Sequence, residues 1–289
     1  MTGKTFKQCA IITDSVACLT GEQVQKYGIG IVLLNIVYAG KAYKDWVDIT
    51  PKTAYEFFLQ NPDVFSTSAP TPEDFLQAYR EAAPQAKNIL CITLSTKLST
   101  TCNTAKIAVD YAKKELPGTH IEVMDSRTAA AAEGFIALAA ARAAAAGKSF
   151  VEVVEAAAGM REKVMALVLL DTIRHVYRSG RVPRIAAQAG SILNLHPLLS
   201  VYNGVNFIGV AHNREKGIEL LLRKTKEKVG GKPVHMAVLH AYAGEAAEKL
   251  KQRAAAEFDC RELWVSEFSP IMGYACGTGT LGLAFYSED

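Results

Sequence analysis

The sequence lacks the patterns that would place it in several common classes. Its six cysteines are scattered and form no CxxC pair, so we expect free thiols in a reducing cytosol rather than disulfides. A net charge of only +3 gives no indication of nucleic-acid binding. The six histidines show neither HExxH nor another ligand spacing, so we expect no metal site.

No segment indicates targeting or insertion into a membrane. The first residues, MTGKTFKQ, are polar, and Cys9–Ile12 is too short for the apolar region of a signal peptide. The alanine-rich stretch 129–146 has the length of a transmembrane helix, but Glu133, Gly134 and Arg142 interrupt it. We therefore expect a cytoplasmic protein without integral membrane association.

Motifs of cofactor-dependent or nucleophilic enzymes are incomplete. Gly277–Gly282 satisfies GxGxxG, but only seven residues follow it, too few for a βαβ unit. Gly147-Lys148-Ser149 resembles the end of a P-loop, but Arg142 stands where the first glycine should be. No GxSxG is present, and no nucleophile, base and orienting group can be assigned. The sequence favours binding over catalysis, with no cofactor.

What is present is the composition of an ordinary globular protein, 49% hydrophobic and 21% charged. Short apolar runs alternate with helix-like segments in the first half, which predicts a parallel sheet with helices on both faces. The expected strands are Cys9–Thr13, Ile31–Tyr38, Ile89–Leu94 and His120–Met124. Lys41–Asp48 is expected to be a polar connection. Helices are expected to begin at Thr50-Pro51 and Thr71-Pro72, the second ending near Ala82, and to cover the alanine-rich stretch and Phe150–Lys163.

The second half predicts an α+β arrangement. Asn203-Gly204 between Pro197–Val201 and Val205–Val210 is a strong hairpin signal, because both turn positions tolerate positive φ. Further strands are expected at Val164–Leu170, Val234–Leu239, Leu263–Phe268 and Leu281–Tyr286, and helices at Ile185–Leu193, Arg214–Val229 and Gly244–Phe258. We expect an N-terminal Rossmann-like α/β domain over residues 1–163 and a C-terminal α+β domain with a mixed or antiparallel sheet over 164–289.

Hydroxyl and acidic side chains recur where strands of the first half end. They are Thr13-Asp14-Ser15, Ser95-Thr96 and Asp125-Ser126. In open α/β sheets ligands bind beyond the carboxyl ends of the strands. A helix is expected to begin just after Ser95, and its free N–H groups would suit an anionic group. The alternative is that these side chains are simple helix caps.

Six segments in order resemble the DegV family of bacterial fatty-acid-binding proteins. They are IITDSVACL (11–19), STSAPTPEDFLQAY (66–79), LSTKLSTTCNTA (94–105), VMDSRTAAAAEG (123–134), RSGRVPRIAAQAGSILNLHPLL (178–199) and PIMGYACGTGTLGLAF (270–285). The matches run nearly end to end. Their order and spacing carry the resemblance more than any one of them does.

The resemblance implies two domains with a long-chain fatty acid between them, presented to a separate fatty acid kinase or carried towards phospholipid synthesis. It implies that hydroxyls hold the carboxylate: Thr67, Ser68 and Ser95, with Thr96 and Ser99 as further candidates. For the acyl chain we expect Phe75, Leu98, Ile192 and Leu195 as lining. Each buried CH₂ contributes about 0.8 kcal/mol, so a long chain binds tightly once donors satisfy its headgroup.

Three positions depart from the family pattern. Ala275 stands where the family usually has a histidine near the headgroup, with Tyr274 beside it as a possible replacement donor. Ala69 replaces the glutamine of the TSQPS-type segment. His212 aligns with the usual arginine after the hairpin, and Arg214 follows two residues on. With Arg181, these two residues are the candidates for facing a phosphate or a partner. One hypothesis is a lipid carrier that is a poor partner for a kinase; the alternative is that Ala275 reflects drift around a site whose backbone still works.

Two other classes remain open. A small kinase-like enzyme related to dihydroxyacetone kinases would need a nucleotide site, against which both incomplete glycine motifs count. An interaction module would use the basic segment Arg174–Arg184, for which a solvated surface is the simpler interpretation.

Overall fold

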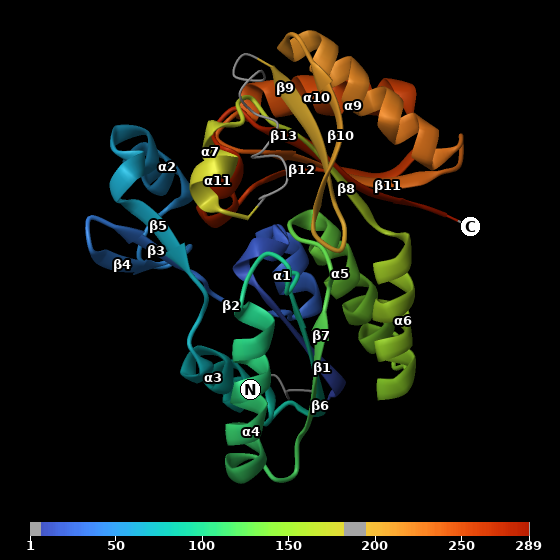
Figure 1. Ribbon diagram of the computed structural model, residues 1–289. Helices are drawn as coiled ribbons and strands as arrows, with labels where there is room; N and C mark the ends of the chain where they lie inside the picture. The colour runs from blue at the N-terminus through green and yellow to red at the C-terminus, as the bar shows by residue number, and fades with distance from the viewer. Residues whose placement is uncertain (1–6, 182–194, 289) are drawn as a thin grey trace.

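The computed structural model describes residues 7–181 and 195–288 (Figure 1). The chain forms two large sheets, one small sheet and the helices that cover them. The predicted helix Ile185–Leu193, and Ile192 with it, lies outside the described residues. All six cysteines are free thiols, as the sequence predicts.

The first sheet is fully parallel, in the order β2-β1-β6-β7. Its strands are β1 (Lys7–Asp14), β2 (Gly30–Val32), β6 (Ala86–Thr93) and β7 (His120–Asp125). The central strands β1 and β6 are apolar and buried over most of their length because both faces are covered. Ile12 and Ile89 pack with Phe75 beneath α3 (Pro72–Ala82) and α4 (Thr101–Glu115). Ile11 and Leu90 pack on the opposite face, which is covered by α5 (Ala131–Ala145).

Helix starts in this half follow their capping residues. Thr71 and Asp74 form a reciprocal capping box that begins α3, and Ser149 and Glu152 do the same for α6 (Phe150–Lys163). A third capping box, Thr20 with Gln23, begins α1 (Gly21–Tyr27). The predicted bounds of α3 and α6 are therefore confirmed.

The second sheet is mixed, in the order β10-β9-β8-β13-β11-β12, with only β11 and β12 parallel. Its strands are β8 (Met165–Leu169), β9 (His196–Val201), β10 (Val205–Ala211), β11 (Val234–His240), β12 (Cys260–Glu267) and β13 (Leu281–Ser287). The predicted hairpin is confirmed by the antiparallel pair β9–β10 around Asn203 and Gly204, both at positive φ. Helices α9 (Arg214–Val229) and α10 (Gly244–Glu257) cover the outer face (Figure 1).

Helix α5 lies between the two large sheets and contacts both (Figure 1). Ten of its residues are buried, on all sides of the helix. Alanine side chains suit this position, because they let two sheets approach a single helix closely, and alanine has the highest helix propensity. The result is one continuous apolar core that includes Ile11 of the first sheet, Phe135 of α5 and Ala284 of the second sheet.

The third sheet, β4-β3-β5, corrects two predictions about the first half. The run Ile31–Tyr38 is not one strand: it divides into β2, in the parallel sheet, and β3 (Asn35–Tyr38), in the small antiparallel sheet. Lys41–Asp48 is not only a connection, because its first residues form β4 (Lys41–Lys44) after the tight turn at Ala39-Gly40. Polar residues form this strand because it is an exposed edge. Strand β5 (Phe65–Ser68) completes the sheet.

Short elements surround the small sheet. They are α2 (Pro51–Gln60), α7 (Arg174–Ser179), α11 (Pro270–Cys276) and the 3₁₀ turns η1 (Ser15–Ala17) and η2 (Pro62–Val64). Helix α11 comes from the end of the chain and contacts α2, β5 and α7. The small sheet is therefore packed against the C-terminal half as well as the N-terminal half.

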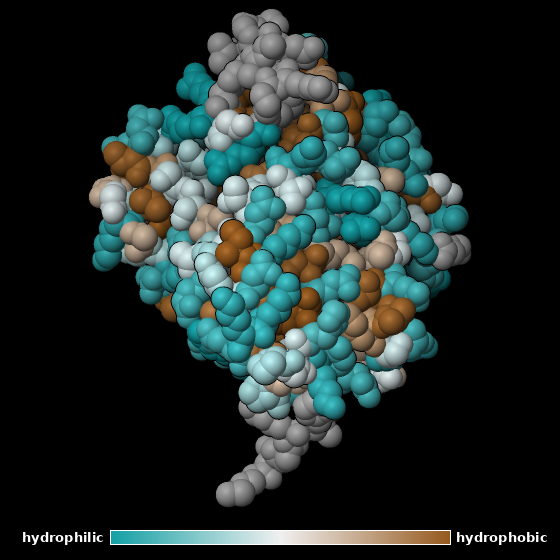
Figure 2. All heavy atoms as spheres, turned by 60° about the horizontal axis from the view of Figure 1, so that its bottom comes forward, coloured by the Kyte–Doolittle hydropathy of each residue, from teal (hydrophilic) through white to brown (hydrophobic). Residues whose placement is uncertain are grey.

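Within the described residues, no helix has the length and apolar character needed to span a membrane. The face of the molecule shown in Figure 2 is mainly hydrophilic, with apolar residues in small scattered groups.

Candidate functional site

A largely apolar pocket opens where the first sheet, the second sheet and the small sheet meet. It encloses about 820 Å³, including the part open to solvent at its mouth. The apolar side chains of its wall come from both halves of the chain: Leu34, Ala69, Leu94, Leu98, Val168, Leu170, Val176, Leu199, Val201, Val205, Phe268, Ile271, Met272, Ala275 and Cys276.

Among residues 7–181 and 195–288, few polar residues line this pocket, and none of those lining residues is acidic. They are Thr67, Ser68 and Ser99, each with a hydroxyl, and Arg181, which is basic. Hydroxyls and a guanidinium are hydrogen-bond donors, and a guanidinium carries a permanent positive charge. An apolar wall with this group of donors suits an amphipathic anion with a long apolar tail.

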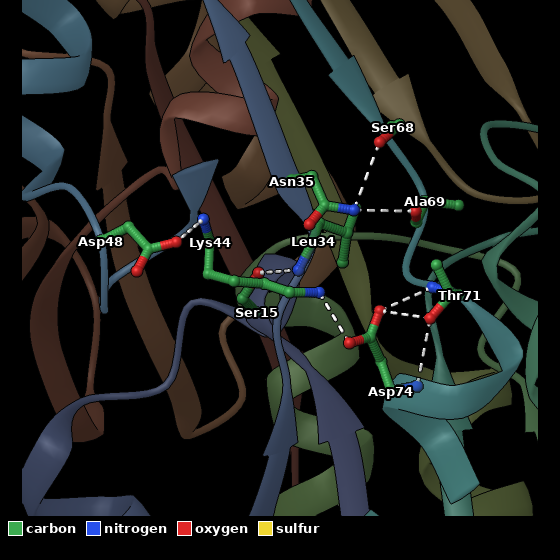
Figure 3. A network of polar contacts seen from close by, with 9 residues as sticks. All are labelled: Ser15, Leu34, Asn35, Lys44, Asp48, Ser68, Ala69, Thr71 and Asp74. Atoms are coloured by element: carbon green, nitrogen blue, oxygen red, sulfur yellow. Dashed lines mark hydrogen bonds and ion pairs between the residues drawn. The ribbon is translucent and has the colours of Figure 1, made fainter. Parts of the chain in front are cut away.

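Strand β5 carries Thr67 and Ser68 to the pocket. In the small sheet Ser68 pairs with Asn35 and Thr67 with Ile36. The Asn35 amide nitrogen lies 3.3 Å from Ser68 Oγ and 3.1 Å from the Ala69 carbonyl oxygen (Figure 3). The sequence-based prediction included Thr67 and Ser68 but missed Asn35, which has no motif of its own. Its only signal is its position, one strand away from a predicted site residue.

The Ser95 junction differs from the prediction, because no helix begins at Ser95. Residues 95–100 form turns, in which Ser95 Oγ accepts a hydrogen bond from the Lys97 N–H, and α4 starts only at Thr101. Ser95 is buried and is not in the pocket lining. Ser99 reaches the pocket instead, and its Oγ accepts from the Thr101 N–H.

Thr96 takes part in a different contact. Its hydroxyl donates to Asp125 Oδ2 at 2.6 Å, which joins the ends of β6 and β7. The Thr96 N–H also faces Asp125 Oδ1, at 3.3 Å. Thr96 is exposed and outside the pocket lining, so these strand-end polar groups bind each other rather than facing the pocket.

Arg181 is held at the pocket by two contacts. Its Nη1 donates to the Ser179 carbonyl at 2.7 Å, and its guanidinium lies 5.9 Å from the centre of the Tyr274 ring. The Tyr274 ring in turn stacks on Phe65 at 5.8 Å. Tyr274 is not in the pocket lining, but it contacts the Arg181 side chain, which is.

Helix α11 brings Ala275 into the pocket wall. The helix begins at Ser269, whose Oγ accepts from the Ile271 N–H and donates to buried Asp45 at 2.5 Å. A Cβ at Gly273 would collide with the Tyr55 ring, so only glycine permits this close contact with α2. Ala275 has no polar group, so the position where the resemblance expects a histidine supplies no donor.

The remaining predicted residues lie elsewhere. Phe75 is fully buried in the separate core between α3, α4 and the first sheet, and is not in the pocket lining. Leu195 is partly buried outside the lining, whereas Leu98 is part of it. His212 is exposed. Arg214 binds Asp171 at 2.8 Å and the Gly279 carbonyl at 2.9 Å, and borders a different surface groove.

Buried carboxyl groups lie behind the pocket wall, and the sequence-based prediction missed their role. Asp14 accepts from the N–H of Leu94, a lining residue, and burial raises its pKa to about 6. Burial also raises the pKa of Asp45 to about 6. Glu133 on α5 accepts from Thr13, and burial together with the nearby Asp14 charge raises its pKa well above the usual range. These buried acids hold neighbouring segments in place through hydrogen bonds. The sequence alone does not show that they are buried.

Little in the site suits covalent or metal chemistry. Burial raises the pKa of the Cys276 thiol, which lines the pocket, to about 12, so it stays protonated and weakly nucleophilic. Among residues 7–181 and 195–288, no three His, Cys, Asp or Glu side chains are grouped so that they could hold a metal ion. The arrangement is suited to binding.

Comparisons with known proteins agree with this fold. The profile of the family described as "Uncharacterised protein, DegV family" matches residues 8–288. A DegV domain-containing protein of Streptomyces coelicolor is 32% identical over 285 residues, covering 98% of this chain and 99% of its own. Among solved structures, a DegV family protein from Thermus thermophilus, described by its fatty acid binding, is 28% identical with a TM-score of 0.89, covering 97% of this chain and 100% of its own. DegV of Bacillus subtilis, described as a fatty acid binding protein, is 26% identical with a TM-score of 0.87, covering 98% and 100%.

Proposed function

Because this chain belongs to the DegV family, we propose that it binds a long-chain fatty acid in the pocket between its two halves. The observation that carries the proposal is the lining itself, which in the described part of the chain is an apolar wall with three hydroxyl residues, one arginine and no acidic residue. The solved relatives from Thermus thermophilus and Bacillus subtilis, described as binding fatty acid, support it.

In this proposal the headgroup lies against Thr67, Ser68, Ser99 and Arg181. The arginine supplies the charge, and the hydroxyls supply further donors. A buried carboxylate without partners would cost several kcal/mol and would take up a proton instead. The acyl chain lies along the apolar wall, where each buried CH₂ contributes about 0.8 kcal/mol.

The function is that of a carrier rather than an enzyme. Delivery to a fatty acid kinase is the family-like role, and Ala275 in the pocket wall favours a carrier that is poorly coupled to such a kinase. An alanine cannot hold or transfer a proton beside a headgroup that is being phosphorylated. We expect loaded wild-type protein to yield little acyl phosphate with a kinase of this family, and Ala275→His to yield more.

Titration of delipidated protein with palmitate, followed calorimetrically, tests the binding proposal. One palmitate should bind per chain, and Leu98→Trp, which fills the pocket, should abolish the heat of binding while leaving the fold intact by circular dichroism. No palmitate binding by the wild-type protein would overturn the proposal. Efficient acyl phosphate formation by the wild-type protein would overturn the weak coupling to a kinase, but not the binding.

A further inference from the structure

Asn35 and Ser68 form a cross-strand pair at the edge of the pocket. They are register partners in the antiparallel pair β3–β5, so their side chains lie on the same face of the small sheet. Ser68 lines the pocket and Asn35 does not. Figure 3 shows the Asn35 amide directed at both Ser68 and Ala69.

The Ala69 carbonyl determines whether the nitrogen or the oxygen of the Asn35 side-chain amide faces Ser68 and Ala69. A carbonyl oxygen can only accept a hydrogen bond, so the amide nitrogen, and not the amide oxygen, must lie 3.1 Å from it. The same nitrogen lies 3.3 Å from Ser68 Oγ and has a second hydrogen to donate. Ser68 Oγ is therefore an acceptor in this contact.

A hydroxyl that accepts from Asn35 keeps its own hydrogen for another partner. Within the part of the chain that the structure describes, Ser68 Oγ has no other hydrogen-bond partner. Since Ser68 lines the pocket, an acceptor bound there is available to take this hydrogen. A serine hydroxyl can either donate or accept a hydrogen bond. Because the Asn35 amide donates to Ser68 Oγ, the Ser68 hydroxyl acts as a donor towards the pocket.

The segments that carry the pair are held firmly on both sides (Figure 3). The Leu34 N–H donates to Ser15 Oγ at 3.2 Å, just before Asn35. After Ala69, Asp74 closes the capping box with Thr71 and binds Lys44 of β4 at 2.7 Å. The Asn35 amide is therefore presented on a rigid element, as positioning requires.

We propose that Asn35 is a positioning residue that turns the Ser68 hydroxyl towards the ligand and so selects a headgroup that only accepts hydrogen bonds. This inference rests on the proposed function and deepens it: the ligand class is an ionised carboxylate rather than an alcohol. An alcohol headgroup can accept a hydrogen bond from the Ser68 hydroxyl or donate one to it. An ionised carboxylate can only accept, so it needs the Ser68 hydrogen.

Asn35→Asp tests the proposal, because a carboxylate at this position accepts the Ser68 hydrogen and reverses the polarity of that hydroxyl. Binding of radiolabelled palmitate and hexadecanol, which have equal chain length, is measured by equilibrium dialysis. Asn35→Asp should weaken palmitate binding at least about tenfold and change hexadecanol binding by less than about twofold. Equal weakening of both ligands would indicate a merely structural role and overturn the proposal.

Asn88→Asp is the matched control. Asn88 is also half-buried and donates to a backbone carbonyl, that of Gln8 at 2.9 Å, but it lies at the start of β6 and outside the pocket lining. Asn88→Asp introduces the same negative charge as Asn35→Asp and should leave the ratio of the palmitate and hexadecanol affinities unchanged. If Asn88→Asp changed this ratio as much as Asn35→Asp does, the effect would come from net charge, and the proposal would be overturned.

A double-mutant cycle provides a second test that needs no new charge. Asn35→Ala should weaken palmitate binding in the wild-type background but have no further effect in the Ser68→Ala background. Additive losses would overturn the proposal. Wild-type protein that binds no palmitate would overturn the proposed function, whereas wild-type binding that Asn35→Asp leaves unchanged would overturn this inference alone.

Discussion

The Ser269 hydroxyl donates to Oδ2 of Asp45 at 2.5 Å and joins parts of the chain that are 224 residues apart. Both side chains are buried. The same Ser269 oxygen caps α11, the helix that carries Ala275 and Cys276 into the pocket wall. One hydrogen bond therefore couples the small sheet of the N-terminal half to the C-terminal pocket wall.

Asp45 should make the stability of the fold depend on pH. Its pKa is raised from 3.8 to about 6 in the folded protein, so the folded state binds a proton more readily than the unfolded state. The resulting stabilisation is complete below about pH 4 and is lost as pH rises through about 6, amounting to about 3 kcal/mol. An asparagine at position 45 has the shape of the protonated acid but does not titrate, so Asp45→Asn removes this contribution to the pH dependence of stability.

We therefore expect the free energy of unfolding of Asp45→Asn, minus that of wild type, to increase between pH 4 and pH 7 in urea titrations, because wild type loses stability over this range. Asp110→Asn is the control, since Asp110 is exposed and forms its ion pair with the exposed Lys113. A difference between wild type and Asp45→Asn that stays constant with pH would contradict this role of Asp45.

Arg181→Gln should weaken fatty acid binding about 10- to 100-fold, because it removes the one charged donor among the lining residues that the structure describes. Palmitate titration measures the loss, and hexadecanol binding should be nearly unaffected. Arg178→Gln is the matched control, because Arg178 lies nearby in α7, binds Asp63 and is outside the lining. Equal losses in the two variants would show that general positive charge, and not Arg181, attracts the ligand.

The apolar wall of the pocket should determine which length of acyl chain binds most tightly. Affinity should rise about fourfold per added CH₂ until the pocket is full, as follows from about 0.8 kcal/mol per buried CH₂. Val168→Phe reduces the space and should move the optimum to a shorter chain, measured over saturated acids from twelve to eighteen carbons. An optimum that does not move would mean that the chain does not pass Val168.

Gly273→Ala should destabilise the protein by about 2–4 kcal/mol, because its Cβ would collide with Tyr55, which is fully buried and donates to the Phe268 carbonyl. Chemical denaturation measures this change. Gly159→Ala is the control in helix α6, where nothing lies within 4 Å of the added Cβ, and it should stabilise by about 0.5–1 kcal/mol. Similar effects of the two changes would contradict the close packing of α11 on α2.

Local signals predicted much of the fold. The capping box of Ser149 and Glu152 marks the start of α6, and Asn203-Gly204 marks the hairpin, because such motifs act within a few residues. The division of Ile31–Tyr38 between two sheets could not be predicted in this way. It depends on strands β1 and β5, which are distant in sequence and pair with its two parts separately.

The site was only partly predictable for the same reason. Thr67, Ser68, Ser99, Leu98, Arg181 and Ala275 line the pocket, whereas Ser95 and Thr96 are engaged in turns and strand-end contacts. A hydroxyl near a strand end does not reveal which way it faces, because its local hydrogen bonds compete with the ligand. The assignment of these residues to a headgroup stays a prediction. Asn35 and the buried Asp45 act through tertiary contacts that no short motif encodes.

Native mass spectrometry of the purified protein, followed by solvent extraction of whatever it releases, tests the central claim most directly. The account predicts one fatty acid per chain, released on denaturation and replaced by added palmitate after delipidation. A protein that is empty as purified and takes up neither palmitate nor oleate would contradict it, and the pocket would then belong to a different ligand.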